Sequence, residues 1–227
     1  MVFPPRCPVC HDIIRGKGLT CNECVSKLKM VEDPYCMRCG KQLKIREKKY
    51  CKLCENNKMF FKEGRAVFVY DEIMRKSIYR FKYGGRREYA EFYAHQIYTK
   101  YESKIKRWNP EVIIPIPLHK SKLKKRGYNQ AALIAKELSN LTKIPVDEKI
   151  LVRTKKTEKQ KNLGALERNS NLKNAFKIRS NRVQYLSAML IDDIYTTGAT
   201  MNNASMVLRE NGIEEIYLIS LSIGIDV

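Results

Sequence analysis

Eight cysteines are the densest group of metal-binding residues in this sequence. They form four Cys-x-x-Cys pairs within the first 54 residues, separated by ten, eleven and eleven residues. A Cys-x-x-Cys turn points two thiolates at one ion, and two such turns complete the tetrahedral set that zinc prefers. The residues are Cys7, Cys10, Cys21, Cys24, Cys36, Cys39, Cys51 and Cys54. Their spacing predicts two structural zinc sites.

The short gaps favour neighbouring pairs that share an ion, as in two successive zinc ribbons. An interleaved cross-brace is the alternative pairing. His11 follows Cys10 directly, and we expect it to be a bystander because eight thiols already supply both sites. Four thiolates leave no open position for a catalytic water, so the predicted role is structural. The ribbon segment is either a docking surface for a partner or a folding cap on the next domain.

A second group with chemical potential is the stretch "MLIDDIYTTGAT" at residues 189–200. We expect Asp192 and Asp193 at the carboxyl end of a buried strand, where ligands gather in parallel sheets. The small residues after them let backbone N–H groups converge on a phosphate at the start of a helix. Carboxylates repel phosphate, but they accept hydrogen bonds from sugar hydroxyls and attract Mg²⁺. The combination predicts a site for a sugar phosphate.

Two basic segments are expected to be loops that meet an anion. The first, His119–Gln130, follows a strand that ends in prolines and carries Lys120, Lys122, Lys124, Lys125 and Arg126. The second, Arg153–Asn171, is long and polar, and its cations include Lys155, Lys156, Lys161 and Arg168. Long loops in compact domains are usually functional or disordered, and the charge here favours a mobile cover over an anion.

The composition is strongly basic. Lysine and arginine number 44 against 24 acids, a formal charge of +20, which the thiolates of two zinc sites lower to about +16. Such a balance favours a polyanionic partner, and nucleic acid is the leading class. The start of the chain lacks the apolar core of a signal peptide, and no apolar run reaches the roughly 18 residues of a membrane helix. We therefore expect a cytoplasmic protein without a transmembrane segment.

Apolar periodicity predicts alternating strands and helices after the cysteines. The expected strands are 65–70, 111–117, 149–153, 187–191 and 214–222, and the expected helical stretches are 71–83, 86–108, 129–141 and 199–210. Continuously apolar strands separated by helices are typical of a parallel α/β sheet. The predicted organisation is a small double zinc-ribbon domain at residues 1–60 and an α/β domain at residues 61–227.

The stretch "AMLIDDIYTTGAT" resembles the phosphoribosyl pyrophosphate (PRPP) signature of the type I phosphoribosyltransferases. The resemblance implies that fold for the second domain, with PRPP or another 5-phosphoribosyl compound as ligand and Mg²⁺ as its companion ion. It implies that Asp192 and Asp193 take the ribose hydroxyls. It also implies that the 5′-phosphate is held by Thr196, Thr197, Gly198, Ala199 and Thr200. The two basic segments then correspond to the pyrophosphate loop and the mobile catalytic loop.

A narrower resemblance covers nearly the whole chain. The ribbons, "FKYGG", "PIPLH" with "RGYNQ", the set Gln160, Leu163, Arg168 and Asn171, and "AF" at 175–176 occur in the order typical of the ComF family. This order resembles most closely the ComFC late-competence proteins of bacterial transformation. The resemblance implies a cytosolic factor for incoming single-stranded DNA, with a ComFA-type helicase as partner. An active phosphoribosyltransferase with an unidentified acceptor is the alternative.

Overall fold

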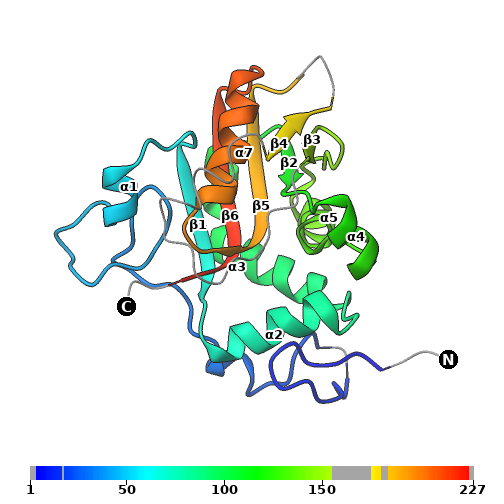
Figure 1. Ribbon diagram of the computed structural model, residues 1–227. Coiled ribbons are helices and arrows are strands. Elements are labelled where there is room, and N and C mark those ends of the chain that lie inside the picture. The colour runs from blue at the N-terminus through cyan, green and yellow to red at the C-terminus, as the bar shows by residue number, and fades with distance from the viewer. Residues whose placement is uncertain (1–3, 17, 155–174, 180–183, 225–227) are drawn as a thin grey trace.

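A four-stranded parallel sheet forms the centre of the molecule. The computed structural model describes residues 4–16, 18–154, 175–179 and 184–224. The strand order is β1-β6-β5-β2, and every neighbouring pair is parallel. The strands are β1 (Glu63–Val69), β2 (Val112–Pro115), β5 (Ser187–Tyr195) and β6 (Glu215–Ile223). The parallel sheet flanked by helices that was predicted for the second domain is confirmed (Figure 1).

Helices cover both faces of the sheet. One face packs against α2 (Glu72–Tyr83), α3 (Tyr89–Trp108) and α5 (Gln130–Thr142). The other face packs against α7 (Ala199–Glu210), whose bounds match the predicted helix. Side chains alternate along β5, so Met189 and Ile191 are buried in the core with α2, α3 and α5. Ala188 and Leu190 are buried in the core with α7.

Strand β5 extends four residues beyond its predicted end at Ile191. Pairing with β6 continues to Tyr195, which lies opposite Ile223. Pairing with β2 stops at Pro115, opposite Ile191, and the last bond of this ladder is donated by the Ile116 N–H to the Ile191 carbonyl. Asp192 and Asp193 therefore lie within the last part of the strand, beyond the end of β2, and not in a loop after it.

The predicted strand at 149–153 does not join the parallel sheet. Its observed part, β3 (Leu151–Arg153), pairs antiparallel with β4 (Phe176–Ile178) in a separate two-stranded sheet. The sequence pattern did not indicate β4 as a strand, because three residues are too few for a period to be recognised.

The cysteine-rich segment straddles one edge of the sheet. Its middle part runs antiparallel to β1, where the Val31 N–H donates to the Val67 carbonyl and the Val69 N–H donates to the Lys29 carbonyl. Lys100 of α3 secures this crossing by donating from Nζ to the Val31 carbonyl at 2.5 Å. Burial lowers the pKa of Lys100 to about 8. The first ribbon therefore packs on the outside of α2, while the second ribbon joins the core on the α7 face of the sheet (Figure 1).

Two short helices complete the first half of the chain. The segment η1 (Val25–Lys27) belongs to the first ribbon, and α1 (Lys52–Asn56) begins directly after Cys51 of the second. In the ranges that the structure describes, no helix combines the length and the apolar character needed to cross a membrane.

Candidate functional site

The cysteines gather in two groups of four, each made of two neighbouring pairs. The first group joins Cys7 and Cys10 with Cys21 and Cys24, and its ligand atoms lie within 4.8 Å of one another. The Cys10 and Cys21 sulfur atoms are 3.7 Å apart. A tetrahedron with Zn–S arms of about 2.3 Å has edges of about 3.8 Å, so this spacing fits zinc. The grouping agrees with the sequential pairing and not with the interleaved cross-brace.

The first group lies against α2 and α3. Ser77 of α2 donates to the Pro8 carbonyl at 2.5 Å, and the Tyr89 hydroxyl of α3 donates to the Cys7 carbonyl at 3.2 Å. His11 contacts that same hydroxyl through Nδ1 at 2.7 Å and is not part of the thiol group. These bonds attach the first ribbon to the helices at three points.

The second group, Cys36, Cys39, Cys51 and Cys54, is buried in the core that α7 forms with the sheet. Asn202 on the first turn of α7 links this helix to the residues that follow the second cysteine group. Its Oδ1 accepts from the Phe60 N–H at 2.8 Å, and its Nδ2 donates to the Lys58 carbonyl at 2.9 Å. The start of α7 is therefore held by the end of the ribbon segment.

The turn between β5 and α7 is shaped by one glycine and one tyrosine. Gly198 adopts φ 71°, and a Cβ atom built there would lie 2.0 Å from the Tyr195 hydroxyl. That hydroxyl is buried without a hydrogen-bond partner among the described atoms. Burial raises the pKa of Tyr195 well above its usual value. Only glycine satisfies both the left-handed backbone and the close approach of this ring.

The N-terminus of α7 presents backbone donors at the carboxyl edge of the sheet. Gly198 is the N-cap residue and supplies no side-chain cap, so the first N–H groups of the helix keep their capacity for a ligand. Thr196 is exposed, Thr197 and Thr200 are half-buried, and Ala199 is buried. The predicted phosphate site depends on these backbone donors, and it stays a prediction.

The paired acids point to opposite faces of the sheet because they are neighbours on one strand. Asp193 lies on the α2 face, where it accepts from Lys82 Nζ at 2.7 Å. Asp192 accepts from the Asp193 N–H at 2.8 Å. Burial, followed by the charge of Asp193, raises the pKa of Asp192 to about 7. Lys82 belongs to the "FKYGG" stretch, to which the sequence analysis assigned no chemical role.

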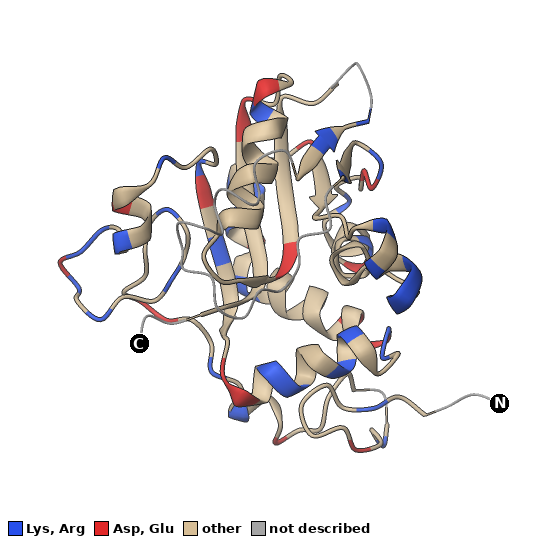
Figure 2. Ribbon diagram, viewed as in Figure 1, with Lys and Arg blue, Asp and Glu red and all other residues tan. Residues whose placement is uncertain are grey.

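The first basic segment is a helix and not the predicted loop. Helix α4 (Lys120–Arg126) begins behind His119, whose Nδ1 accepts from the Ser121 N–H, and it ends at Gly127 with φ 80°. All five predicted cations lie on α4, which is the densest blue segment in Figure 2. Arg126 contacts Gln130, and its guanidinium lies 4.9 Å above the Tyr83 ring. The helix follows β2 and so lies beyond the carboxyl edge of the sheet.

Most of the second basic segment lies outside the residues that the structure describes. Lys155, Lys156, Lys161 and Arg168, together with Gln160, Leu163 and Asn171, lie outside the residues that the structure describes. Arg153, at the start of that segment, lies on β3 with its guanidinium 5.3 Å from the Phe176 ring. Its positive charge acts on Asp192 and opposes the rise in the pKa of that carboxyl group.

Comparison with known proteins identifies relatives of this chain. Residues 1–55 match the model of a double zinc ribbon domain. Competence protein F of Haemophilus influenzae is 44% identical over 115 residues, a match that spans half of each chain. A purine phosphoribosyltransferase structure from Pyrococcus horikoshii is similar at 17% identity and a TM-score of 0.38, covering 58% of this chain and 73% of that one.

The longest of these matches is to competence protein ComFC of Bacillus subtilis. The identity is 30% over 206 residues, which cover 88% of this chain and 82% of that protein. The match includes both the ribbon segment and the α/β domain. The chain belongs to the ComFC family of competence proteins.

Proposed function

We propose that this protein binds single-stranded DNA during DNA uptake and holds a 5-phosphoribosyl group at the carboxyl end of β5. The observation that carries the proposal is the uncapped start of α7, which follows two carboxylates on the same strand. Backbone N–H groups at that helix end favour a phosphate, while the acids favour sugar hydroxyls. PRPP is the ligand with both features that the sequence motif indicates.

Mg²⁺ is the ion that we expect to accompany PRPP. Asp192 has the oxygen chemistry that Mg²⁺ takes from proteins, and a cation beside it would favour the charged form of its carboxyl group. The bound ion would neutralise part of the negative charge of the pyrophosphate group. Asp193 already has a cationic partner in Lys82, so Asp192 is the better candidate for this role.

Single-stranded DNA binding is supported by the surface that α4 forms with the end of α2. Tyr79 and Tyr83 are 64% and 53% exposed, and their rings lie 5.0 Å apart. Cations neutralise phosphates while exposed rings stack on bases. Phe81 and Tyr128, which the sequence analysis grouped with these aromatics, are buried and take no part in the surface. A ComFA-type helicase and a cytoplasmic location fit the same role.

Calorimetric titration with PRPP and Mg²⁺ tests the phosphoribosyl site. The double variant Thr196→Val/Thr197→Val should lower the affinity at least tenfold, because it removes two hydroxyl donors that are exposed or half-buried. The matched control is Thr142→Val, since the Thr142 hydroxyl donates to the Leu138 carbonyl within α5. Equal affinity of the two variants would contradict the site.

Salt titration of a labelled oligo(dT) strand tests the DNA surface. The variant Lys120→Gln/Lys124→Gln/Lys125→Gln should reduce the slope of log affinity against log salt by about 2, at about 0.7 for each phosphate contact. The matched control, Lys106→Gln/Lys143→Gln/Lys149→Gln, removes the same charge from other elements and should leave the slope unchanged. An affinity independent of salt in the unaltered protein would refute DNA binding.

Phosphoribosyl transfer is the second candidate function. It is favoured by α4, whose cations follow the strand next to β5 and could stabilise a departing pyrophosphate. Pyrophosphate release from PRPP with a panel of nucleobases tests this activity. Absence of release with every base, together with full cellular function of Asp192→Asn/Asp193→Asn, would reject it.

A further inference from the structure

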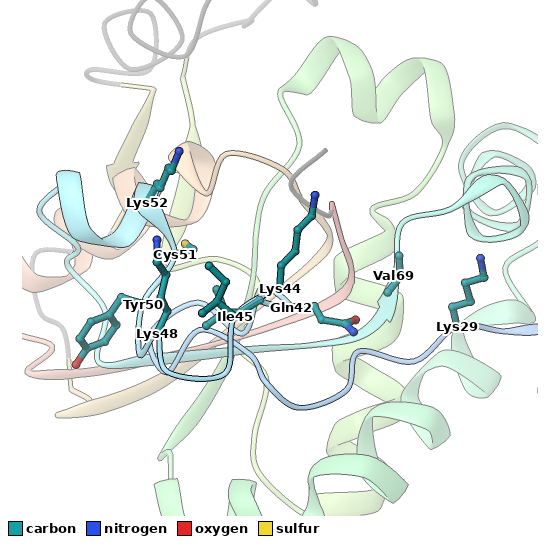
Figure 3. A pocket seen from close by; sticks show the side chains of 10 residues that line it. Lys29, Gln42, Lys44, Ile45, Lys48, Tyr50, Cys51, Lys52 and Val69 are labelled. Carbon is teal, nitrogen blue, oxygen red and sulfur yellow. The ribbon is translucent and has the colours of Figure 1, made fainter.

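A second cationic surface lies on the other side of the molecule from α4. It lines a cavity of about 720 Å³ between the second ribbon and the end of β1. Its lining includes Lys29, Lys44, Lys48 and Lys52 and no acidic residue. Figure 3 shows the four amino groups pointing the same way, with Tyr50 at one end of the group. We call these four lysines the ribbon lysines.

The ribbon lysines carry charge that the described residues do not neutralise. All four side chains are exposed, and within the described ranges none of them has an ion-pair partner. A zinc ion with four thiolates contributes about −2 nearby, so the four cations leave a local excess of about +2. Two lysines would be enough to neutralise the charge of about −2 at the zinc site, but four line the cavity. The excess favours an anionic ligand.

The cavity also offers apolar and aromatic surface, which a free inorganic anion would not use. Ile45 is 49% exposed and Tyr50 is 37% exposed, although both are large side chains. The Arg38 guanidinium lies 5.6 Å from the centre of the Tyr50 ring. Cations beside an accessible ring are the combination with which proteins bind single strands, because the ring stacks on a base.

The cavity lies at the same edge of the sheet as α4. Val69, the last residue of β1, lines the cavity, while α4 follows the end of β2. Strands β1 and β2 are the two edges of one parallel sheet, so both basic surfaces lie at its carboxyl edge. Three strand spacings of about 4.8 Å place β1 about 14 Å from β2. A single strand that follows this edge of the sheet could contact both surfaces.

We propose that this cavity binds the phosphate backbone of single-stranded DNA, with one base stacked on Tyr50. The proposal rests on the proposed DNA-binding function and assigns the second ribbon a direct part in it. The ribbon lysines then act as a second anchor for a strand that α4 also contacts. The ribbon is a nucleic-acid contact in addition to a folding unit.

Salt-dependent binding of oligo(dT) by Lys44→Gln/Lys48→Gln/Lys52→Gln tests the proposal. The affinity should fall at least tenfold, and the slope against log salt should drop by about 2, at about 0.7 for each phosphate contact. The control Lys106→Gln/Lys143→Gln/Lys149→Gln has the same net charge and should keep the original slope. Zinc content and melting temperature are measured on every variant, because a change in either would indicate a damaged ribbon.

A second measurement uses the unaltered protein. Photo-crosslinking of a thiothymidine strand, followed by peptide mapping, should label the peptide that contains Tyr50. If the ribbon variant binds like the control and the label is found only elsewhere, the inference is overturned while DNA binding by the protein stands. Loss of DNA binding that occurs only together with loss of zinc would also overturn it. If the unaltered protein shows no salt-dependent binding, the proposed function itself fails.

Discussion

The substitution Gly198→Ala tests the turn that forms the candidate phosphate site. Gly198 has φ 71°, and its added Cβ atom would lie 2.0 Å from the Tyr195 hydroxyl and 2.3 Å from the ring carbon that carries it. The ring is buried against the core of the second ribbon and cannot move into solvent. The substitution therefore combines a backbone penalty with a steric one.

Each of the two penalties has an expected magnitude. An L-residue in the left-handed region costs about 1–2 kcal/mol. Displacing a packed ring in a core costs a further 1–3 kcal/mol or so. The sum is about 2–5 kcal/mol, a large part of the 5–15 kcal/mol or so that stabilises a typical domain. We also expect PRPP binding to be lost, because the N–H groups of the turn must shift with the ring.

Urea unfolding at constant zinc concentration measures these terms. Gly85→Ala is the matched control, since Gly85 has φ 69° and nothing within 4 Å of its built Cβ. It should cost only the backbone penalty. Gly198→Ala should exceed it by about 1–3 kcal/mol. Adding Tyr195→Val should remove the excess, giving a coupling energy of similar size. Equal losses for the two glycine variants would refute the steric argument.

Three further predictions concern charge and metal. The folded pKa of Asp192, about 7, lies above its unfolded value of about 4, so its stabilising contribution is complete below about pH 4 and is lost as the pH rises through about 7. Melting temperatures should show that Asp192→Asn gains on the unaltered protein across this window, and a constant difference would contradict it. Lys82→Met should cost about 3 kcal/mol by leaving the 12% exposed Asp193 side chain unpaired. Urea unfolding should show that adding Asp193→Asn recovers most of the loss; no recovery would argue against the ion pair. A chelator should remove zinc from the first cysteine group before the second, because Cys10 and Cys21 are partly exposed and the second group is wholly buried. A zinc-sensitive dye should then record two phases, and a single phase would disagree with this burial.

Local features of the fold could be predicted from the sequence because they depend on neighbours along the chain. The sequential pairing of the cysteines agrees with the structure, since ten or eleven residues keep successive Cys-x-x-Cys turns close. Helix α7 begins and ends where its pattern indicated, at Ala199 and Glu210. In both cases turn residues and periodicity carry the information.

Helix α4 was not predicted, although a helix is held by bonds between neighbours along the chain. Adjacent lysines repel one another on a short helix, and its only pattern signals are the His119 cap and Gly127. The extension of β5 was missed for another reason. Its last residues are held by pairing with β6, and no apolar run marks them. The strand predicted from the apolar run therefore ended at Ile191, directly before Asp192 and Asp193.

The sequence by itself determined the large positive charge and the two sets of four zinc-binding thiols, and it predicted a phosphate turn behind two acids. Residue type and short spacing suffice for those conclusions. Tertiary structure alone decided that the first ribbon packs against α2 and α3 while the second is buried beside α7. It also decided that Lys82 meets Asp193 across 111 positions, and that Lys44 and Lys52 share a cavity with Val69. These contacts arise because apolar faces far apart in the chain must be buried together, and that packing sets which charges meet.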